Sequence, residues 1–267
     1  MSETAAAGLG GLWAPERRAV WLGVAGVTLL SWLYLWHLAA AMGEDMAGMA
    51  NMVMPREEPW SLLDIALTFA MWAIMMVGMM LPSAAPTIAL FASLDRRRRS
   101  GGDASTFAAF AAGYLAVWAG FSLFATLAQL GLDRAFFLTM AQSLASPLIA
   151  GGLVLAAGLY QLTPLKRACL SHCRSPVGFL VAHWRRGQWG AFRLGARHGA
   201  WCLGCCAFLM LLLFVGGIMN LVWVAALALV VMAEKLVPHG DRLAQAAGVL
   251  LLAAGAWMVG SAVLGGA

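Results

Sequence analysis

The chain consists of long apolar runs separated by short polar segments, and within the runs apolar and polar residues do not alternate. Seven runs approach or exceed the roughly 20 residues that cross a bilayer. They cover about residues 19–41, 62–82, 106–130, 142–162, 193–216, 220–237 and 243–264. Only helices and closed barrels satisfy their backbone in lipid, and continuous runs favour helices. The pattern therefore predicts an all-α, polytopic membrane bundle of about seven transmembrane helices. We expect residues 1–18 to be a disordered cytoplasmic segment and residues 19–267 to be one transmembrane domain.

Composition and the placement of charge agree with a membrane protein. The mean hydropathy of +0.82 and the 11% of charged residues exclude an ordinary soluble domain. If Arg17 and Arg18 lie in the cytoplasm, fifteen of the seventeen Lys and Arg residues fall on that side, leaving Arg56 and Arg134 outside. The positive-inside rule then predicts a cytoplasmic amino terminus and an external carboxyl terminus in the cell inner membrane. The partner of this charge is the lipid bilayer, and no nucleic-acid binding is expected.

The first apolar run has two interpretations. Ala39, Ala40 and Ala41 resemble a signal-peptidase site at its end. However, the run is longer than the apolar region of about 7–15 residues found in signal peptides. We therefore expect it to be retained as a membrane helix.

The fifth run carries one histidine and three cysteines. His198, Cys202 and Cys205 follow the spacing i, i+4 and i+7 and share one helix face, with Cys206 on its flank. An imidazole and several thiols form a soft ligand set that selects Cu(I), Zn or an iron–sulfur cluster. Free cysteine also packs as a small apolar residue, so a packing role stays open. Polar residues inside a membrane are costly and usually functional, which favours the metal.

Methionines are concentrated in the first third of the chain, where ten of the sixteen lie between Met42 and Met80. In the second run a stripe at helical spacing is formed by Met71, Met75 and Met79. An external segment that suits metal capture contains Met42, Met46, Met49, Met52 and Met54. Thioether sulfur suits Cu(I), but methionine is also an adaptable packing residue. If the second and fifth helices touch, their stripes lie at similar depth and could form one site.

Three further features lie near the inner side. Cys169, His172 and Cys173 offer two or three ligands on one helical turn, without the second pair that a zinc finger requires. Glu234 is expected to form an ion pair with Lys235, Arg193 or Arg197, or to gate an exit. Pro82 and Pro86 are expected to break or kink the second helix as it leaves the membrane.

These observations support three functional hypotheses. The leading one is a Cu(I)-handling protein, with Zn as the second choice of metal, that transports or delivers the ion. The sequence lacks a G-x-x-x-x-G-K-[ST] loop, so this chain alone is not an ATP-driven pump, and no catalytic residues are assigned. The second is an accessory or assembly subunit that binds a membrane-protein partner, with a structural metal or none. The third is a thiol oxidoreductase using Cys202 and Cys205, which their mid-helix position disfavours.

Four motifs occur in order along the chain. They are Met71 to Ser83; Tyr160 to Lys166 with Cys169 and Cys173; Gly195 to Cys206; and Met219-Asn220 to Glu234-Lys235. This succession resembles a family of bacterial integral membrane proteins described as predicted metal-binding proteins, a domain family of unassigned function. The resemblance covers about residues 60–240 and implies a membrane location and a metal site. The chain departs from the family pattern at Ala207, where a cysteine pair is followed by alanine instead of an aromatic residue.

Overall fold

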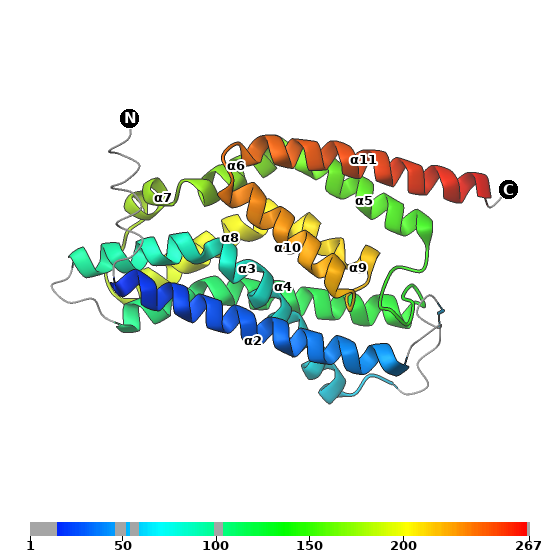
Figure 1. Ribbon diagram of the computed structural model, residues 1–267, viewed down its shortest axis with the longest axis horizontal. Helices are drawn as coiled ribbons and strands as arrows, with labels where there is room; N and C mark the ends of the chain where they lie inside the picture. Colours follow the sequence, from blue (N-terminus) through cyan, green and yellow to red (C-terminus); the bar gives the residue numbers. More distant parts are fainter. Residues whose placement is uncertain (1–14, 46–51, 54–58, 99–103, 266–267) are drawn as a thin grey trace.

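The computed structural model describes residues 15–45, 52–53, 59–98 and 104–265. Within these ranges the protein is an all-α bundle, as the apolar runs predicted, with one isolated β-bridge between Leu138 and Leu144 (Figure 1). The helices are α2 (Pro15–Asp45), α3 (Leu62–Arg98), α4 (Ala104–Arg134), α5 (Pro147–Leu162), α6 (Pro164–Arg174), α7 (Pro176–Ala182), α8 (Gln188–Leu211), α9 (Leu213–Gly216), α10 (Leu221–Leu236) and α11 (Gly240–Gly265).

Five described stretches are long and apolar enough to cross a membrane. They are Arg18–Ala41, Leu62–Arg96, Ser105–Arg134, Gln188–Gly216 and Gly240–Gly265. A sixth results if α5 and α6, which meet at 64°, form one broken span. The run predicted over 220–237 becomes α10, whose 16 residues fall short of the roughly 20 that span a bilayer. The protein is therefore a polytopic membrane bundle, and the total of seven crossings stays a prediction.

Several helices begin at residues other than those predicted, among them α2 and α5. Helix α2 starts at Pro15, within the segment 1–18 that was predicted to be disordered, and residues 1–14 lie outside the described residues. Helix α5 starts at Pro147, five residues after the predicted start of its run. The reason is local, because the Ser146 hydroxyl accepts a hydrogen bond from the Ile149 amide and Pro147 suits the first helical turn.

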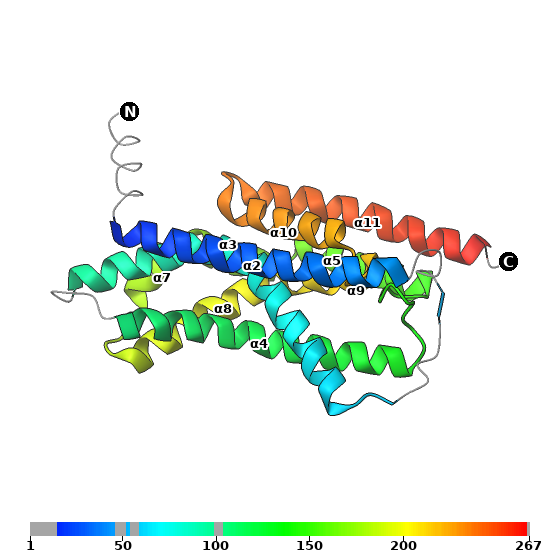
Figure 2. The ribbon, with the colours of Figure 1, turned by 60° about the horizontal axis from the view of Figure 1, so that its bottom comes forward.

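Helix α3 continues through both of its prolines. The sequence predicts that Pro82 and Pro86 break or kink the helix at the membrane boundary, but α3 runs unbroken to Arg98. Figure 2 shows that it changes direction along its length. Hydroxyl groups bond the backbone beside the prolines: the Met80 carbonyl accepts from Ser83 Oγ at 2.8 Å and from Tyr114 Oη at 3.2 Å. The helix is therefore continuous through both prolines, and the predicted break does not occur.

Helices α4 and α8 approach each other very closely at glycine residues. A Cβ atom built on Gly195 of α8 would overlap the Phe110 carbonyl of α4, and one on Gly113 would overlap the Phe192 carbonyl. Small residues allow backbones in a membrane to pack at this distance. This contact brings Tyr114 of α4 against the cysteine-bearing face of α8.

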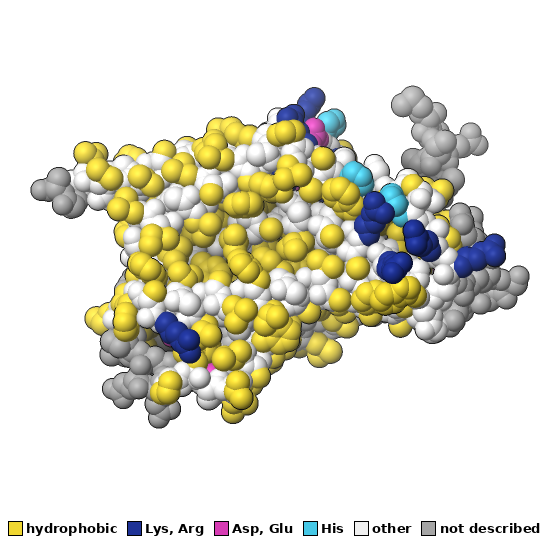
Figure 3. Space-filling model, turned by 180° about the vertical axis from the view of Figure 1, so that it is seen from behind, with side chains coloured by type: hydrophobic (Ala, Val, Ile, Leu, Met, Phe, Trp, Pro, Cys, Tyr) yellow, Lys and Arg dark blue, Asp and Glu magenta, His cyan; other side chains and the backbone are white. Residues whose placement is uncertain are grey.

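Charge is distributed unevenly between the two ends of the bundle. Helix α2 begins at one end and α11 finishes at the other (Figure 1). On the face drawn in Figure 3, the Lys, Arg and His side chains gather mainly at the end where α2 begins, while hydrophobic side chains cover the middle. Large apolar residues on α2 and α11 are exposed, such as Leu30 at 67% and Trp257 at 78%, as a lipid-facing surface requires.

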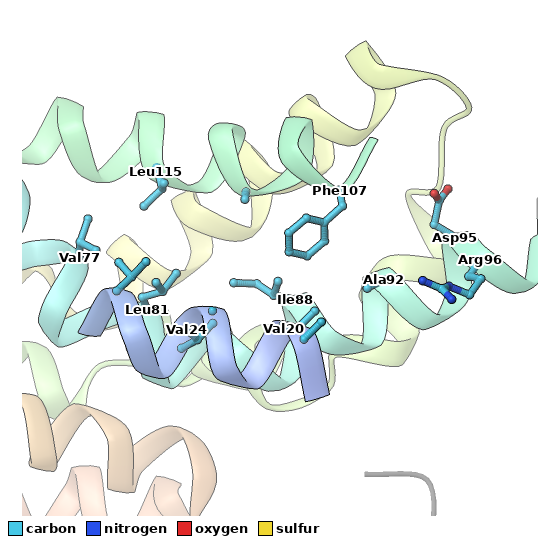
Figure 4. Close-up of a pocket in the computed structure, with 14 residues that line it drawn as sticks. Val20, Val24, Val77, Leu81, Ile88, Ala92, Asp95, Arg96, Phe107 and Leu115 are labelled. Atoms are coloured by element: carbon cyan, nitrogen blue, oxygen red, sulfur yellow. The ribbon is translucent and has the colours of Figure 1, made fainter. Parts of the chain in front are cut away.

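A cavity of about 550 Å³ lies between α2, α3 and α4 (Figure 4). Its lining is almost entirely aliphatic or aromatic, with Asp95 and Arg96 at one end. None of the described cysteines contributes to it. The cavity is therefore separate from the metal-ligand candidates.

Candidate metal centre

The predicted stripe on α8 points into the protein. His198, Cys202, Cys205 and Cys206 are 3%, 1%, 1% and 0% exposed. The Cys205 and Cys206 thiols donate to the Cys202 carbonyl, over 3.1 and 2.9 Å. The His198 ring packs between aromatic side chains, including Tyr114 at 5.7 Å and Phe179 at 5.9 Å between ring centroids.

Helix α6 adds a fourth thiol to this group. The Cys173 side chain neighbours Cys202 and Cys205, and the Cys206 thiol neighbours the same two residues. We call Cys173, Cys202, Cys205 and Cys206 the thiol cluster. Cys173 is its only partly exposed member. The bend of 64° between α5 and α6 and the packing of α6 on α8 bring it there.

The predicted inner group of Cys169, His172 and Cys173 is divided in the structure. Only Cys173 joins the thiol cluster. His172 stacks on Trp201, with ring centroids 4.2 Å apart and planes 6° apart. Cys169 is buried against the backbone of Gly204, where an added Cβ would lie 2.9 Å from its sulfur. The three residues therefore do not form a site of their own in this arrangement.

The methionine stripe reaches the thiols through a residue outside the predicted set. Met71, Met75 and Met79 are buried at 5%, 1% and 2% exposure. The described sulfur contact between α3 and α8 belongs to Met80, whose Sδ lies 3.9 Å from Cys206 Sγ. Helices α3 and α8 thus meet through Met80, which is closer to the prolines than the predicted stripe of Met71, Met75 and Met79.

The external methionine segment lies mostly outside the described residues. Met46, Met49 and Met54 fall in undescribed ranges, and only the backbone of Met42 is described, at the end of α2. Met52 is 55% exposed, and its carbonyl accepts a hydrogen bond from the Met140 amide at 2.9 Å. Metal capture by this segment stays a prediction.

Two polar side chains outside the predicted set touch Cys202. Lys235 Nζ lies 3.0 Å from Cys202 Sγ and 3.2 Å from Ser83 Oγ. The Tyr114 hydroxyl lies 3.3 Å from the same sulfur. In the sequence, Lys235 has the position of a charge at a helix end. Its place next to Glu234 gives no sign that it turns inward.

Glu234 is paired, but its partner is not one of those expected. Its carboxylate accepts from Lys166 Nζ at 2.6 Å and from Gln161 Nε2 at 2.7 Å, and both charged side chains are 0% exposed. Arg197 forms no part of this pair. The predicted Glu234–Arg197 pair is therefore wrong. The cause is the return of α6 against α10, which places Lys166 beside Glu234 across 68 residues of sequence.

The arrangement sets limits on what could bind. Within the described residues, no group of three or more His, Cys, Asp or Glu side chains is arranged to hold a metal ion. The cluster offers neighbouring thiols, the Met80 thioether 3.9 Å from Cys206 Sγ, and the Lys235 ammonium 3.0 Å from Cys202 Sγ. This donor set suits Cu(I) bound by two thiolates better than Zn, which prefers four ligands in a tetrahedron.

Comparison with known proteins identifies a family. A protein-family model described as "PpoB2: Copper chaperone" matches residues 69–258. This range contains the buried methionines of α3, the whole thiol cluster and Lys235, and it agrees with the resemblance seen in the ordered motifs. No curated protein and no solved structure matches the chain.

Proposed function

The chain belongs to the PpoB2 copper chaperone family, and on this basis we propose that it binds Cu(I) at the thiol cluster and passes it on within the inner membrane. The observation that carries the proposal is that three buried thiols of α8 neighbour a fourth, partly exposed thiol of α6 and lie beside a thioether. Burying several thiols together is rarely needed for packing, whereas soft ligands attract a soft ion. We propose a cytoplasmic amino terminus, consistent with the basic end of the bundle.

The positions of the sulfur atoms suggest an order of transfer. Methionine thioethers fill the buried face of α3, and Met80 meets Cys206. Thiolates bind Cu(I) more strongly than thioethers, so an ion that moves from the methionines to the thiol cluster moves downhill. Cys173, which is partly exposed, is the point where the ion leaves for an acceptor. No nucleotide is needed for such a sequence of exchanges.

The direct test is the copper content of the purified protein. The double variant Cys202→Ser/Cys205→Ser is expected to retain less than about one tenth of the Cu(I) bound by the wild type, because hydroxyls are poor ligands for a soft ion. The measurement is elemental analysis after purification in detergent with Cu(I) supplied under reducing conditions. Cys169→Ser is the matched control, since it removes a buried cysteine outside the cluster and is expected to keep most of the metal.

Other outcomes would point to the other hypotheses. Equal copper in the wild type and the double variant would reject binding at the cluster. Preferential retention of Zn would identify a different cargo. A Cys202–Cys205 disulfide that forms and reopens during turnover would indicate thiol exchange. Copurification of a stoichiometric membrane partner, with metal content indifferent to the cysteines, would indicate an assembly subunit.

A second prediction concerns the contact between Met80 and Cys206. Met80→Leu preserves side-chain volume. It is expected to leave the bound copper unchanged but to slow loading by about tenfold, the scale of losing one auxiliary interaction at a metal site. The measurement is the rate of copper uptake by apoprotein after rapid mixing with a Cu(I) donor. Met210→Leu, which alters an equally buried methionine on α8, should load at the wild-type rate. Equal rates for both variants would exclude a path through Met80.

A further inference from the structure

The ammonium group of Lys235 lies inside the bundle among neutral groups. The side chain is 7% exposed, and its Nζ contacts only Cys202 Sγ and Ser83 Oγ among the hydrogen bonds of the described residues. The Tyr114 hydroxyl also lies 3.3 Å from Cys202 Sγ. A lysine in this position is not solvated and is not at the protein surface.

The nearest carboxylate in the sequence is already neutralised. Glu234 is bonded to Lys166 and Gln161, so this buried pair carries no net charge. In the part of the chain that the structure describes, the ion pairs are Lys166–Glu234 and Arg174–Asp241, and Lys235 belongs to neither of them. A buried ammonium without a counter-ion is very costly. The groups near enough to supply negative charge are the thiols, of which Cys202 has its Sγ 3.0 Å from Nζ.

The charge of a bound copper site can therefore be counted. When Cu⁺ displaces the protons of two thiols and those protons pass to water, the copper and its two thiolates carry one net negative charge. The ammonium of Lys235 cancels that charge. A third thiolate would leave a negative charge uncompensated in a medium of low dielectric constant, where such an imbalance is expensive.

We propose that Lys235 is the counter-charge of the copper site and thereby limits Cu(I) to two thiolate ligands, one of them Cys202. This inference depends on the proposed binding of copper at the thiol cluster. Lys235 acts as a positioning and specificity-determining residue and does not itself bind the metal. Neutral donors such as the Met80 thioether can approach without altering the balance. The remaining thiols of the cluster then stay protonated and available for exchange.

The test compares three variants of the full-length chain in detergent. Lys235→Met removes the charge, Lys235→Arg keeps it, and Ser83→Ala removes only the neutral partner of the ammonium. Cu(I) affinity is measured by competition with a chromogenic Cu(I) chelator, and the number of sulfur ligands by X-ray absorption at the copper edge. We expect two thiolate ligands in the wild type. Lys235→Met should bind about 100-fold more weakly, which is the scale of breaking a buried charge pair. Lys235→Arg and Ser83→Ala should stay within about tenfold of the wild type.

Several results would overturn the inference. One is a Lys235→Met protein with wild-type affinity and wild-type sulfur coordination. Another is a wild-type spectrum with three thiolates on copper, which decides the question even if Lys235→Met fails to fold. If Lys235→Met and Lys235→Arg lose Cu(I) affinity to the same extent, Lys235 has a steric role instead. Wild-type protein that binds no Cu(I) at its cysteines would instead reject the proposed function, so the two failures are distinguishable.

Discussion

Lys166→Met is expected to lower the free energy of unfolding by about 3–5 kcal/mol, because it leaves the Glu234 carboxylate buried without its cation. Lys166 and Glu234 are both 0% exposed, and their atoms are 2.6 Å apart. Gln161 remains as a hydrogen-bond donor, but a neutral amide does not replace a charge. The measurement is reversible unfolding in mixed detergent, followed by the helical circular dichroism signal. A large loss would mean that the junction of α6 with α10 depends on this pair.

The double variant Lys166→Met/Glu234→Gln provides the control. It removes both charges while keeping side chains of similar size, and the new amide oxygen on α10 can still accept a hydrogen bond from Gln161. Because replacing a whole buried pair is often nearly neutral, the double variant should recover most of the lost stability. A single variant as stable as the wild type would contradict the prediction. So would a double variant that is less stable than the single one.

Gly195→Ala is expected to destabilise the contact between α4 and α8 by about 2–3 kcal/mol. The new methyl group would overlap the Phe110 carbonyl, so one backbone must move away from the other. The change should also separate Tyr114 from Cys202, because α4 carries the tyrosine that touches the sulfur. The melting temperature in detergent measures the loss of stability.

Gly120→Ala is a matched control for this prediction. Gly120 lies on α4, and nothing stands within 4 Å of an added Cβ. Alanine favours a helix over glycine by about 1 kcal/mol, so the variant should be as stable as the wild type or slightly more stable. A lower melting temperature for Gly195→Ala together with an equal or higher one for Gly120→Ala would establish that packing at Gly195, and not the removal of a glycine as such, causes the effect. Equal melting temperatures for both variants would refute close packing at this point.

The part of the candidate site that lies within one helix could be predicted from the sequence. His198, Cys202 and Cys205 share a face because the helical period fixes their directions, and this needs no knowledge of other helices. All three are buried in the structure. The same reasoning placed Met71, Met75 and Met79 on one stripe of α3, and they too are buried.

The contacts between helices could not be predicted in this way. Cys173 joins the thiols because α6 bends back onto α8, and Lys235 reaches Cys202 because α10 ends beside it. Both contacts depend on helix packing that a single sequence does not encode in its periodicity. The positive-inside count includes Lys166 and Lys235, but a count of charges does not indicate that both side chains are buried in the protein.

The sequence predicted which segments form helices, but the structure does not confirm the predicted number of membrane-spanning helices. Each of the seven apolar runs is largely helical in the described residues, since long apolar runs in lipid have little alternative. The helices differ in length from the apolar runs because residues at the helix ends set where a helix starts and stops. In α10, Asn220 caps the first turn, and Val237 and Pro238 follow the last one. In α3 the helix continues through both prolines to Arg98, where the sequence predicted a break or kink.

The angle between α5 and α6 has a mechanical consequence for the thiol cluster. Three of its sulfurs sit on a helix anchored along its length by α4, while the fourth is on an 11-residue segment joined at Thr163. The distance of Cys173 from the other three sulfurs therefore depends on the angle between α5 and α6. A change in that angle would move one thiol while the other three keep their places on α8.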